Sequence, residues 1–128
     1  MREHWRGFAT KIIGIDNINN YYDPEIKKKK IIQLKNNGNK FKFIKIDISN
    51  KNALKKVFIT YKPDYVFNLA AQAGVRYSIE NPMAYIKSNL VGFSNILEAC
   101  RHNGVQHLVY ASSSSVYGGN TKMPFSEM

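Results

Sequence analysis

The sequence predicts an α/β fold in which helices cover a doubly wound parallel sheet. Short apolar runs alternate with longer segments of helical spacing, in the order strand, helix, strand, helix, strand, helix, strand. Proline and glycine mark several of the boundaries. The 128 residues suffice for one domain.

The first strand and the first helix have clear signals. Lys11–Asp16 is a short apolar run that ends in an acid, which is typical of a buried strand. After a loop, Asp23 and Pro24 provide a helix cap and a proline suited to the first helical position. We therefore expect a helix from Pro24 to about Asn36, which Gly38 and its asparagine neighbours would stop.

A second strand, a second helix and a third strand follow. Phe41–Asp47 is rich in Phe and Ile and reads as a strand. Lys51 to about Tyr61 is expected to be a helix, and Pro63 separates it from the apolar strand Asp64–Leu69. The apolar residues that set the helical spacing are Leu54, Val57 and Phe58.

The longest helix is expected to begin at Asn81 and Pro82 and to end near Asn103, before Gly104. Gln106–Ala111 is the last expected strand, and a serine run follows it. Residues at steps of three and four predict the buried stripe of the long helix: Ile86, Leu90, Phe93, Leu97 and Cys100.

The charge is uneven. Of the net charge of +10, residues 1–62 contribute 15 Lys/Arg against 5 Asp/Glu, whereas residues 63–128 hold 4 of each. Basic stripes can bind nucleic acid, but no zinc-finger spacing or RNA-binding motif accompanies this one, so we expect no nucleic-acid partner. Lys, Asn and Ile make up a third of the chain, which favours a compositional origin, with Lys27–Lys30 as a solvated helix face.

Other classes of protein are disfavoured. No apolar run approaches the roughly 20 residues of a membrane helix, and Met1–Thr10 has no signal-peptide core. Cys100 is the one cysteine, and His4, His102 and His107 have no ligand spacing, so we expect neither a disulfide nor a metal site. We expect a cytoplasmic protein.

Candidate site residues lie at the strand ends, because parallel α/β sheets bind ligands outside the carboxyl ends of their strands. Asp16 could accept hydrogen bonds from a ribose, or act as an ordinary turn cap. The small residues after Leu69 could admit a cofactor or pack tightly. Arg76 could clamp an anion or lie on the surface, and the serine run could present a hydroxyl or form a polar loop.

Taken together, these segments resemble the extended short-chain dehydrogenase/reductase family over about residues 11–128. Within it the resemblance is closest to nucleotide-sugar 4-epimerases, in particular UDP-glucuronate 4-epimerases. The segments that carry the resemblance are Ile13–Asn17, Asp47–Ile48, Asn68–Ser78, Ser88–Gly92 and Tyr110–Gly118.

The resemblance implies a partial Rossmann-type NAD-binding domain over residues 1–128, NAD as cofactor and a UDP-sugar as substrate. Asp16 would hold the adenosine ribose, and Asp47 and Ile48 would flank the adenine. The remaining implied cofactor residues are Asn17 beside Asp16, then Leu69, Ala70, Ala71 and Gln72 along the pyrophosphate and nicotinamide ribose, with Asn89 nearby.

On the substrate side, the resemblance implies that Ser113 is catalytic and binds the sugar hydroxyl at C4, with Ser114 and Ser115 as neighbours. Arg76 would face the acid or phosphate end of the substrate. Related dehydratases and decarboxylases carry a carboxylate at the place of Ser115, so the serine favours epimerisation through a transient 4-keto sugar. The intact enzyme would be a homodimer.

Two family features do not occur in this sequence. The glycines, at positions 7, 14, 38, 74, 92, 104, 118 and 119, form no Gly-rich fingerprint, and no Tyr-x-x-x-Lys pair follows the serine run. Met1–Thr10 would be the tail of the helix after the fingerprint, with Trp5 and Phe8 packing inward.

We therefore expect an inactive fragment of an epimerase, whose absent first strand would be the centre of the family sheet. The strands on either side would pair directly or leave edges exposed. The alternatives are a non-catalytic remnant that binds nucleotide or a paralogue, and, within the family, a dehydratase or decarboxylase.

Overall fold

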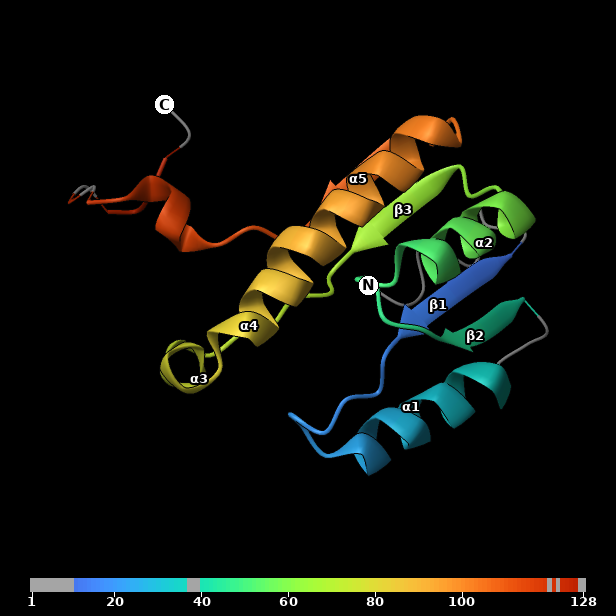
Figure 1. Ribbon diagram of the computed structural model, residues 1–128, viewed down its shortest axis with the longest axis horizontal. Helices are drawn as coiled ribbons and strands as arrows, with labels where there is room; N and C mark the ends of the chain where they lie inside the picture. Colours follow the sequence, from blue (N-terminus) through green and yellow to red (C-terminus); the bar gives the residue numbers. More distant parts are fainter. Residues whose placement is uncertain (1–10, 37–39, 120, 122, 127–128) are drawn as a thin grey trace.

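The computed structural model describes residues 11–36, 40–119, 121 and 123–126. Within them the chain alternates strands and helices as predicted (Figure 1). The strands are β1 (Ile12–Asp16), β2 (Phe41–Lys45), β3 (Tyr65–Asn68) and β4 (His107–Tyr110). The helices are α1 (Pro24–Asn36), α2 (Lys51–Tyr61), α3 (Val75–Glu80), α4 (Pro82–Tyr85) and α5 (Phe93–His102), with a π-helical segment η2 (Ile86–Gly92) and a 3₁₀ turn η3 (Ser114–Tyr117).

The strands form two parallel pairs. β1 pairs with β2, with Ile12 opposite Phe41, and β3 pairs with β4, with Tyr65 opposite His107. No strand ladder joins β1 to β3 in the described part of the chain. β1 and β3 are the strands expected on either side of the family's central strand, and they do not pair directly with each other.

Helix ends follow the local signals of the sequence. The side chain of Asp23 accepts a hydrogen bond from Glu25 N (2.9 Å) at the start of α1, and Asn50 accepts one from Ala53 N (3.0 Å) at the start of α2. Asn81 caps α4 in the same way through Ala84 N. Gly104 has a φ of +66°, the left-handed conformation that lets the chain leave α5. The stop signal at residues 37–39 and the expected packing of Trp5 and Phe8 lie outside the described residues.

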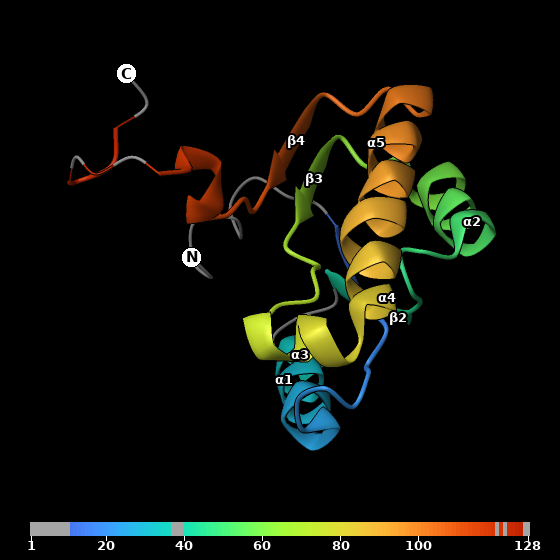
Figure 2. The same cartoon turned by 60° about the vertical axis from the view of Figure 1, so that its left-hand side comes forward.

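A small core joins the two strand pairs. It consists of buried Ile48, Leu54, Phe58, Ile96 and Cys100, which come from the segment after β2 and from α2 and α5. Ile15 of β1, Val66 of β3 and Leu108 of β4 pack against the same cluster. α2 and α5 lie side by side in both views, so this helical layer bridges strand pairs that share no ladder (Figures 1 and 2).

The predicted stripe of the long helix is wrong in part. Cys100 is buried, but Ile86, Leu90 and Leu97 are 42%, 63% and 44% exposed. The buried line is instead Gly92, Ile96 and Cys100. Ile86 and Leu90 lie in the wider π turns of η2, where a period of 3.6 residues does not hold. Leu97 lies in α5, whose buried residues are Ile96 and Cys100.

Two further differences concern short segments. No local pattern predicted α3, which begins after Gly74 at a φ of +99°. In the lysine run, Lys28–Lys30 are exposed as predicted, but Lys27 is half-buried and forms an ion pair with Asp16. Lys27 therefore belongs to the site described below and not to the solvated face.

Because the core is small, truncation of a buried leucine should cost much more stability than truncation of an exposed one. Leu54→Ala removes a side chain that is 1% exposed and should lower the free energy of unfolding by about 3 kcal/mol. Leu90→Ala, at a side chain that is 63% exposed, should lower it by less than about 0.5 kcal/mol. Urea unfolding followed by circular dichroism measures both, and equal losses would contradict the assigned core.

Candidate functional site

A cavity of about 250 Å³ lies where β1, β2 and β3 end. Eight of the predicted cofactor residues line it: Asp16, Asn17, Asp47, Ile48, Leu69, Ala70, Ala71 and Gln72. Segments far apart in the sequence meet here because the carboxyl ends of parallel strands share one edge. These positions therefore lie together in the structure, and their cofactor roles stay predictions.

Asp16 is the last residue of β1 and shapes the turn that follows. Its Oδ1 accepts a hydrogen bond from Ile18 N (2.6 Å), which holds Ile18 at a φ of +51°, an uncommon value for a β-branched residue. Lys27 Nζ, from the first turns of α1, lies 3.1 Å from Oδ1 and 3.5 Å from Oδ2. The carboxylate therefore has a cation beside both of its oxygens.

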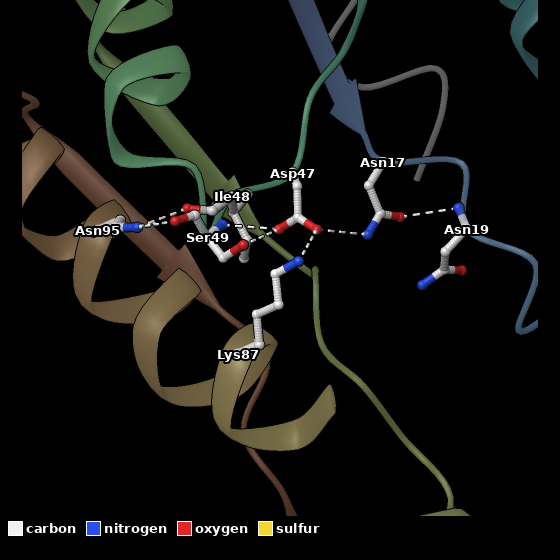
Figure 3. A network of polar contacts seen from close by, with 7 residues as sticks. All are labelled: Asn17, Asn19, Asp47, Ile48, Ser49, Lys87 and Asn95. Atoms are coloured by element: carbon white, nitrogen blue, oxygen red, sulfur yellow. Dashed lines mark hydrogen bonds and ion pairs between the residues drawn. The ribbon is translucent and has the colours of Figure 1, made fainter. Parts of the chain in front are cut away.

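Asp47 is the centre of a polar network that joins three segments (Figure 3). Its Oδ1 accepts hydrogen bonds from Ser49 N (2.9 Å) and Ser49 Oγ (2.7 Å). Its Oδ2 accepts one from Asn17 Nδ2 (3.3 Å) and lies 3.6 Å from Lys87 Nζ on η2. Asn17 Oδ1 accepts a bond from Asn19 N (3.1 Å), so the loops after β1 and β2 are tied together.

The surroundings of Asp47 favour its charged form. Partial burial raises the pKa of the carboxyl group, but the hydrogen bonds from Ser49 and Asn17 and the charge of Lys87 outweigh it and hold the pKa below its ordinary 3.8. At neutral pH the side chain is therefore an anion that accepts hydrogen bonds. It can take another donor, such as a ligand amine, without a change of protonation.

The segment after β2 is also fastened to the long helix. Asn95 Nδ2 of α5 donates to the carbonyls of Ile48 (3.0 Å) and Ser49 (3.1 Å). Gly92 allows Ile48 to lie directly against the helix, since a Cβ at this position would be 2.6 Å from Ile48 Cγ1. A side chain at position 92 would displace Ile48 from both the core and the cavity wall.

Small residues and a side-chain amide shape the third wall. Ala70 and Ala71 are exposed toward the cavity region after β3, and the adjacent Gln72 is buried. Asn89 of η2 accepts a hydrogen bond from Gln72 N (2.8 Å) and donates one to Gln72 O (3.0 Å). Asn89 therefore fixes the backbone beside the cavity but is not among the residues that line it.

Tyrosines link the loop after β1 to the turn before α3. The Tyr21 ring packs on the rings of Tyr22 and Tyr77, with centroids 4.7 and 4.9 Å away. The Tyr85 hydroxyl donates to the carbonyl of Ala73 (2.8 Å) and also contacts that of Gly74. Loss of water contact and the neighbouring tyrosines raise the pKa of Tyr21 above 10.0, so it is a neutral wall of the cavity.

The predicted substrate residues lie away from this cavity. Ser113 Oγ donates to Ser115 Oγ (3.1 Å) and accepts a bond from Ser115 N (3.2 Å), so it caps η3. Ser114 and Arg76 are exposed, and none of the four lines the cavity. The segment after β4 runs away from the helices and strands in both views (Figures 1 and 2). The substrate roles of these residues stay predictions.

Residues 8–128 match the family described as GDP-mannose 4,6 dehydratase. The chain belongs to this family of nucleotide-sugar epimerases and dehydratases. The expected resemblance is thereby confirmed, and the fold is a partial Rossmann-type domain.

The chain is similar to several relatives and solved structures, some of which are named as epimerases. It is 56% identical over 115 residues to protein CapI of Staphylococcus aureus (90% of this chain, 34% of CapI) and 48% identical over 117 residues to UDP-glucuronate 4-epimerase 4 of Arabidopsis thaliana (91% and 26%). A UDP-glucuronic acid 4-epimerase mutant of Bacillus cereus, solved with NAD and a fluorinated UDP-glucuronic acid, is 33% identical, with a TM-score of 0.72 over 86% of this chain and 34% of the other. The chain thus spans about a third of the length of these relatives.

The polar groups of the cavity suit part of a dinucleotide. They include two carboxylate acceptors, Asp16 and Asp47, and the ammonium donor of Lys27, with alanines where a backbone must approach closely. The cavity volume of about 250 Å³ is below the roughly 300–1,000 Å³ of pockets that hold a complete ligand. The described residues therefore suit part of a nicotinamide dinucleotide.

Sequence reasoning missed several residues of the site. The lysine-rich composition offered no reason to single out Lys27 or Lys87. In the structure each of them pairs with one of the two aspartates. The spacing from Asp47 to Ser49 is that of an Asx turn and could have indicated the cap. Asn95 carried no signal, because its partners are backbone carbonyls 46 and 47 residues away.

No group of His, Cys, Asp and Glu within the described ranges could hold a metal ion. A search of the same ranges for a helix long and apolar enough to cross a bilayer also finds none.

The Asp47 network predicts a specific loss of stability in acid. Because the folded pKa is below 3.8, the charged carboxylate stabilises the fold above that pH, and this contribution disappears as the pH falls below it. Asp47→Asn should therefore lower the free energy of unfolding by about 1.5 kcal/mol at pH 7. The difference from the parent chain should shrink below pH 3.8.

Urea unfolding at pH 7, 5, 4 and 3 measures this difference. Asp64→Asn, at an exposed carboxylate in the loop before β3, is the matched control and should keep the acid response of the parent. An Asp47→Asn chain with the parent's pH dependence would show that the network does not stabilise the fold.

Proposed function

We propose that this chain forms the adenosine-binding part of an NAD-dependent UDP-sugar 4-epimerase. The observation that carries the proposal is the pair of carboxylates, Asp16 and Asp47, at the ends of adjacent parallel strands in one cavity. Asp16 Oδ2 is positioned to accept ribose hydroxyls, and Asp47, held as an anion, to accept the amine of adenine.

The turn after β3 supports the next part of the cofactor. Ala70 and Ala71 carry no side chain beyond Cβ, so a phosphate or ribose can approach the backbone there. The two hydrogen bonds between Asn89 and Gln72 hold that backbone in place before a ligand arrives, which reduces the entropy lost on binding. When bound, NAD would supply the hydride acceptor and donor for the sugar C4.

UDP-glucuronate is the substrate that the comparisons favour. The relatives from Arabidopsis thaliana and Bacillus cereus are named for this sugar nucleotide. In this proposal Ser113 binds the C4 hydroxyl, with Ser114 and Ser115 beside it, and Arg76 pairs with an acidic group of the substrate. Ser115 is a neutral residue, which favours epimerisation over elimination chemistry.

We propose binding as the role of these 128 residues. The residues of the described cavity hold the adenosine end of NAD.

We also propose that the intact enzyme is a homodimer that uses the long helical segment. Several apolar side chains of this segment are exposed: Met83 and Leu90 are each 63% exposed, and Leu97 is 44% exposed. Exposed apolar surface of this kind is typical of protein interfaces. A second copy of the same segment would cover it in a symmetric pair.

NAD binding to the purified chain tests the main proposal. Isothermal titration calorimetry should show saturable binding of NAD, and Asp16→Ala should weaken it about tenfold, because one charge-assisted contact to the ribose is lost. Asp64→Ala, at an exposed carboxylate outside the cavity, should bind as the parent does. Absence of binding to the parent, or equal binding by Asp16→Ala, would refute the proposal.

Self-association tests the dimer. Leu90→Lys should shift sedimentation velocity profiles toward the monomer at concentrations where the parent associates, because a charge in an apolar interface is costly. Ile32→Lys, at a residue of α1 that is 56% exposed, is the control and should leave the association unchanged. A parent chain that is monomeric at every concentration, or a Leu90→Lys chain that associates as the parent does, would contradict the use of this segment as the dimer interface.

A further inference from the structure

The short helix α3 has little packing of its own. None of its six residues is buried, and Val75 and Ile79 are 83% and 82% exposed. No side chain caps its first turn, which begins after Gly74. Figure 1 shows α3 at one end of the helical segment that includes α4 and α5. Helices of this length are not stable in isolation, so α3 needs contacts from other segments to stay ordered.

Tyrosine side chains provide such contacts. Tyr77 of α3 is half-buried, and its ring centroid lies 4.9 Å from that of Tyr21 and 6.2 Å from that of Tyr85. Aromatic pairs at these separations stabilise packing beyond the area that they bury. Asn81 Nδ2 donates to the Tyr77 hydroxyl (3.0 Å), and the Tyr85 hydroxyl donates to the carbonyl of Ala73 (2.8 Å), just before the helix. Tyr21, Tyr77 and Tyr85 thus form a tyrosine clasp that holds α3.

Tyr21 belongs both to the tyrosine clasp and to the cavity. It lies in the loop after β1 and lines the cavity, whereas Tyr77 and Tyr85 do not. Its hydroxyl lies so close to Gly74 that a Cβ at this position would overlap the oxygen. A side chain at position 74 would therefore push Tyr21 away from α3. Tyr21 is thus the member of the clasp through which a ligand in the cavity can act on α3.

We infer that Tyr21 is a positioning residue, which couples an occupied cavity to the order of α3 and thereby to the position of Arg76. A ligand in the cavity packs against the Tyr21 ring and restricts its motion. The ring then offers Tyr77 a fixed surface, so opening of α3 costs more free energy. The inference rests on the proposed binding of NAD. It makes Arg76, an exposed residue of α3, depend on a cavity that it does not line.

Amide hydrogen exchange of the full chain, followed by NMR with and without NAD, tests the coupling. The backbone N–H groups of Ser78 and Asn81 report on α3, because they donate the hydrogen bonds that close its turns (3.3 and 2.8 Å). Saturating NAD should slow exchange at both amides about tenfold, a coupling of ordinary size. The N–H of Ser49, which donates to Asp47 in the cavity, reports on NAD binding itself and should also be protected.

Four variants separate the tyrosine clasp from the cavity. Tyr21→Ala removes the ring and should abolish the effect of NAD on α3, while Ser49 stays protected. Tyr21→Phe keeps the ring and should behave as the parent does. Tyr77→Ala leaves the cavity wall intact and should also abolish the effect on α3, so it decides the matter should Tyr21→Ala not bind NAD. Tyr65→Ala, at a residue that is 57% exposed and outside the cavity, is the matched control and should leave both responses unchanged.

Each outcome has a distinct meaning. Protection of α3 that is lost in Tyr21→Ala and Tyr77→Ala but kept in Tyr21→Phe supports the inference. Protection of Ser49 without protection of α3 in the parent, or protection of α3 that survives the alanine variants, overturns the inference and leaves the proposed function standing. If NAD protects no amide of the parent, the proposed binding is refuted and the inference falls with it.

Discussion

Two strand pairs without a common ladder must be kept in register by something other than backbone hydrogen bonds. In this chain the Asp47 network does so at the edge where ligands would bind. The carboxylate is held by Asn17 after β1, by Ser49 after β2 and by Lys87 on η2. These contacts connect the first strand pair to the helix that covers the second, and the cavity between them keeps its shape through this connection.

The hydrophobic core supports the same connection between the two strand pairs. Ile48 is both a wall of the cavity and a member of the buried cluster with Leu54, Phe58, Ile96 and Cys100. Its carbonyl accepts a hydrogen bond from Asn95, and its side chain lies against Gly92. Packing and polar contacts thus converge on the short segment after β2. Both the stability of the fold and the geometry of the site depend on it.

Much of the fold could be predicted, because its signals are local. Asp23, Asn50 and Asn81 cap helices that begin where the sequence indicates, and Lys51–Tyr61 is helical over the predicted residues. The convergence of Asp16 and Asp47 followed from the parallel α/β order alone. Those predictions needed only neighbours in the chain or the general topology of such sheets.

Other features depend on contacts that no local pattern contains. The buried line of the long helix includes Gly92, because the missing side chain there permits the close approach of Ile48, 44 residues earlier in the chain. Lys27 looked like one of four equivalent lysines until the loop after β1 brought Asp16 beside it. The serine run forms a 3₁₀ turn that does not line the cavity, and its substrate role stays a prediction.

The most direct test of the central claim is an amide NMR titration of the ¹⁵N-labelled chain with NAD. The account predicts that the resonances that shift belong to the cavity: Asp16–Asn19, Asp47–Ile48 and Leu69–Gln72. Shifts confined to the exposed lysines of α1, or no shifts at millimolar NAD, would contradict the claim that this chain holds the adenosine end of the dinucleotide.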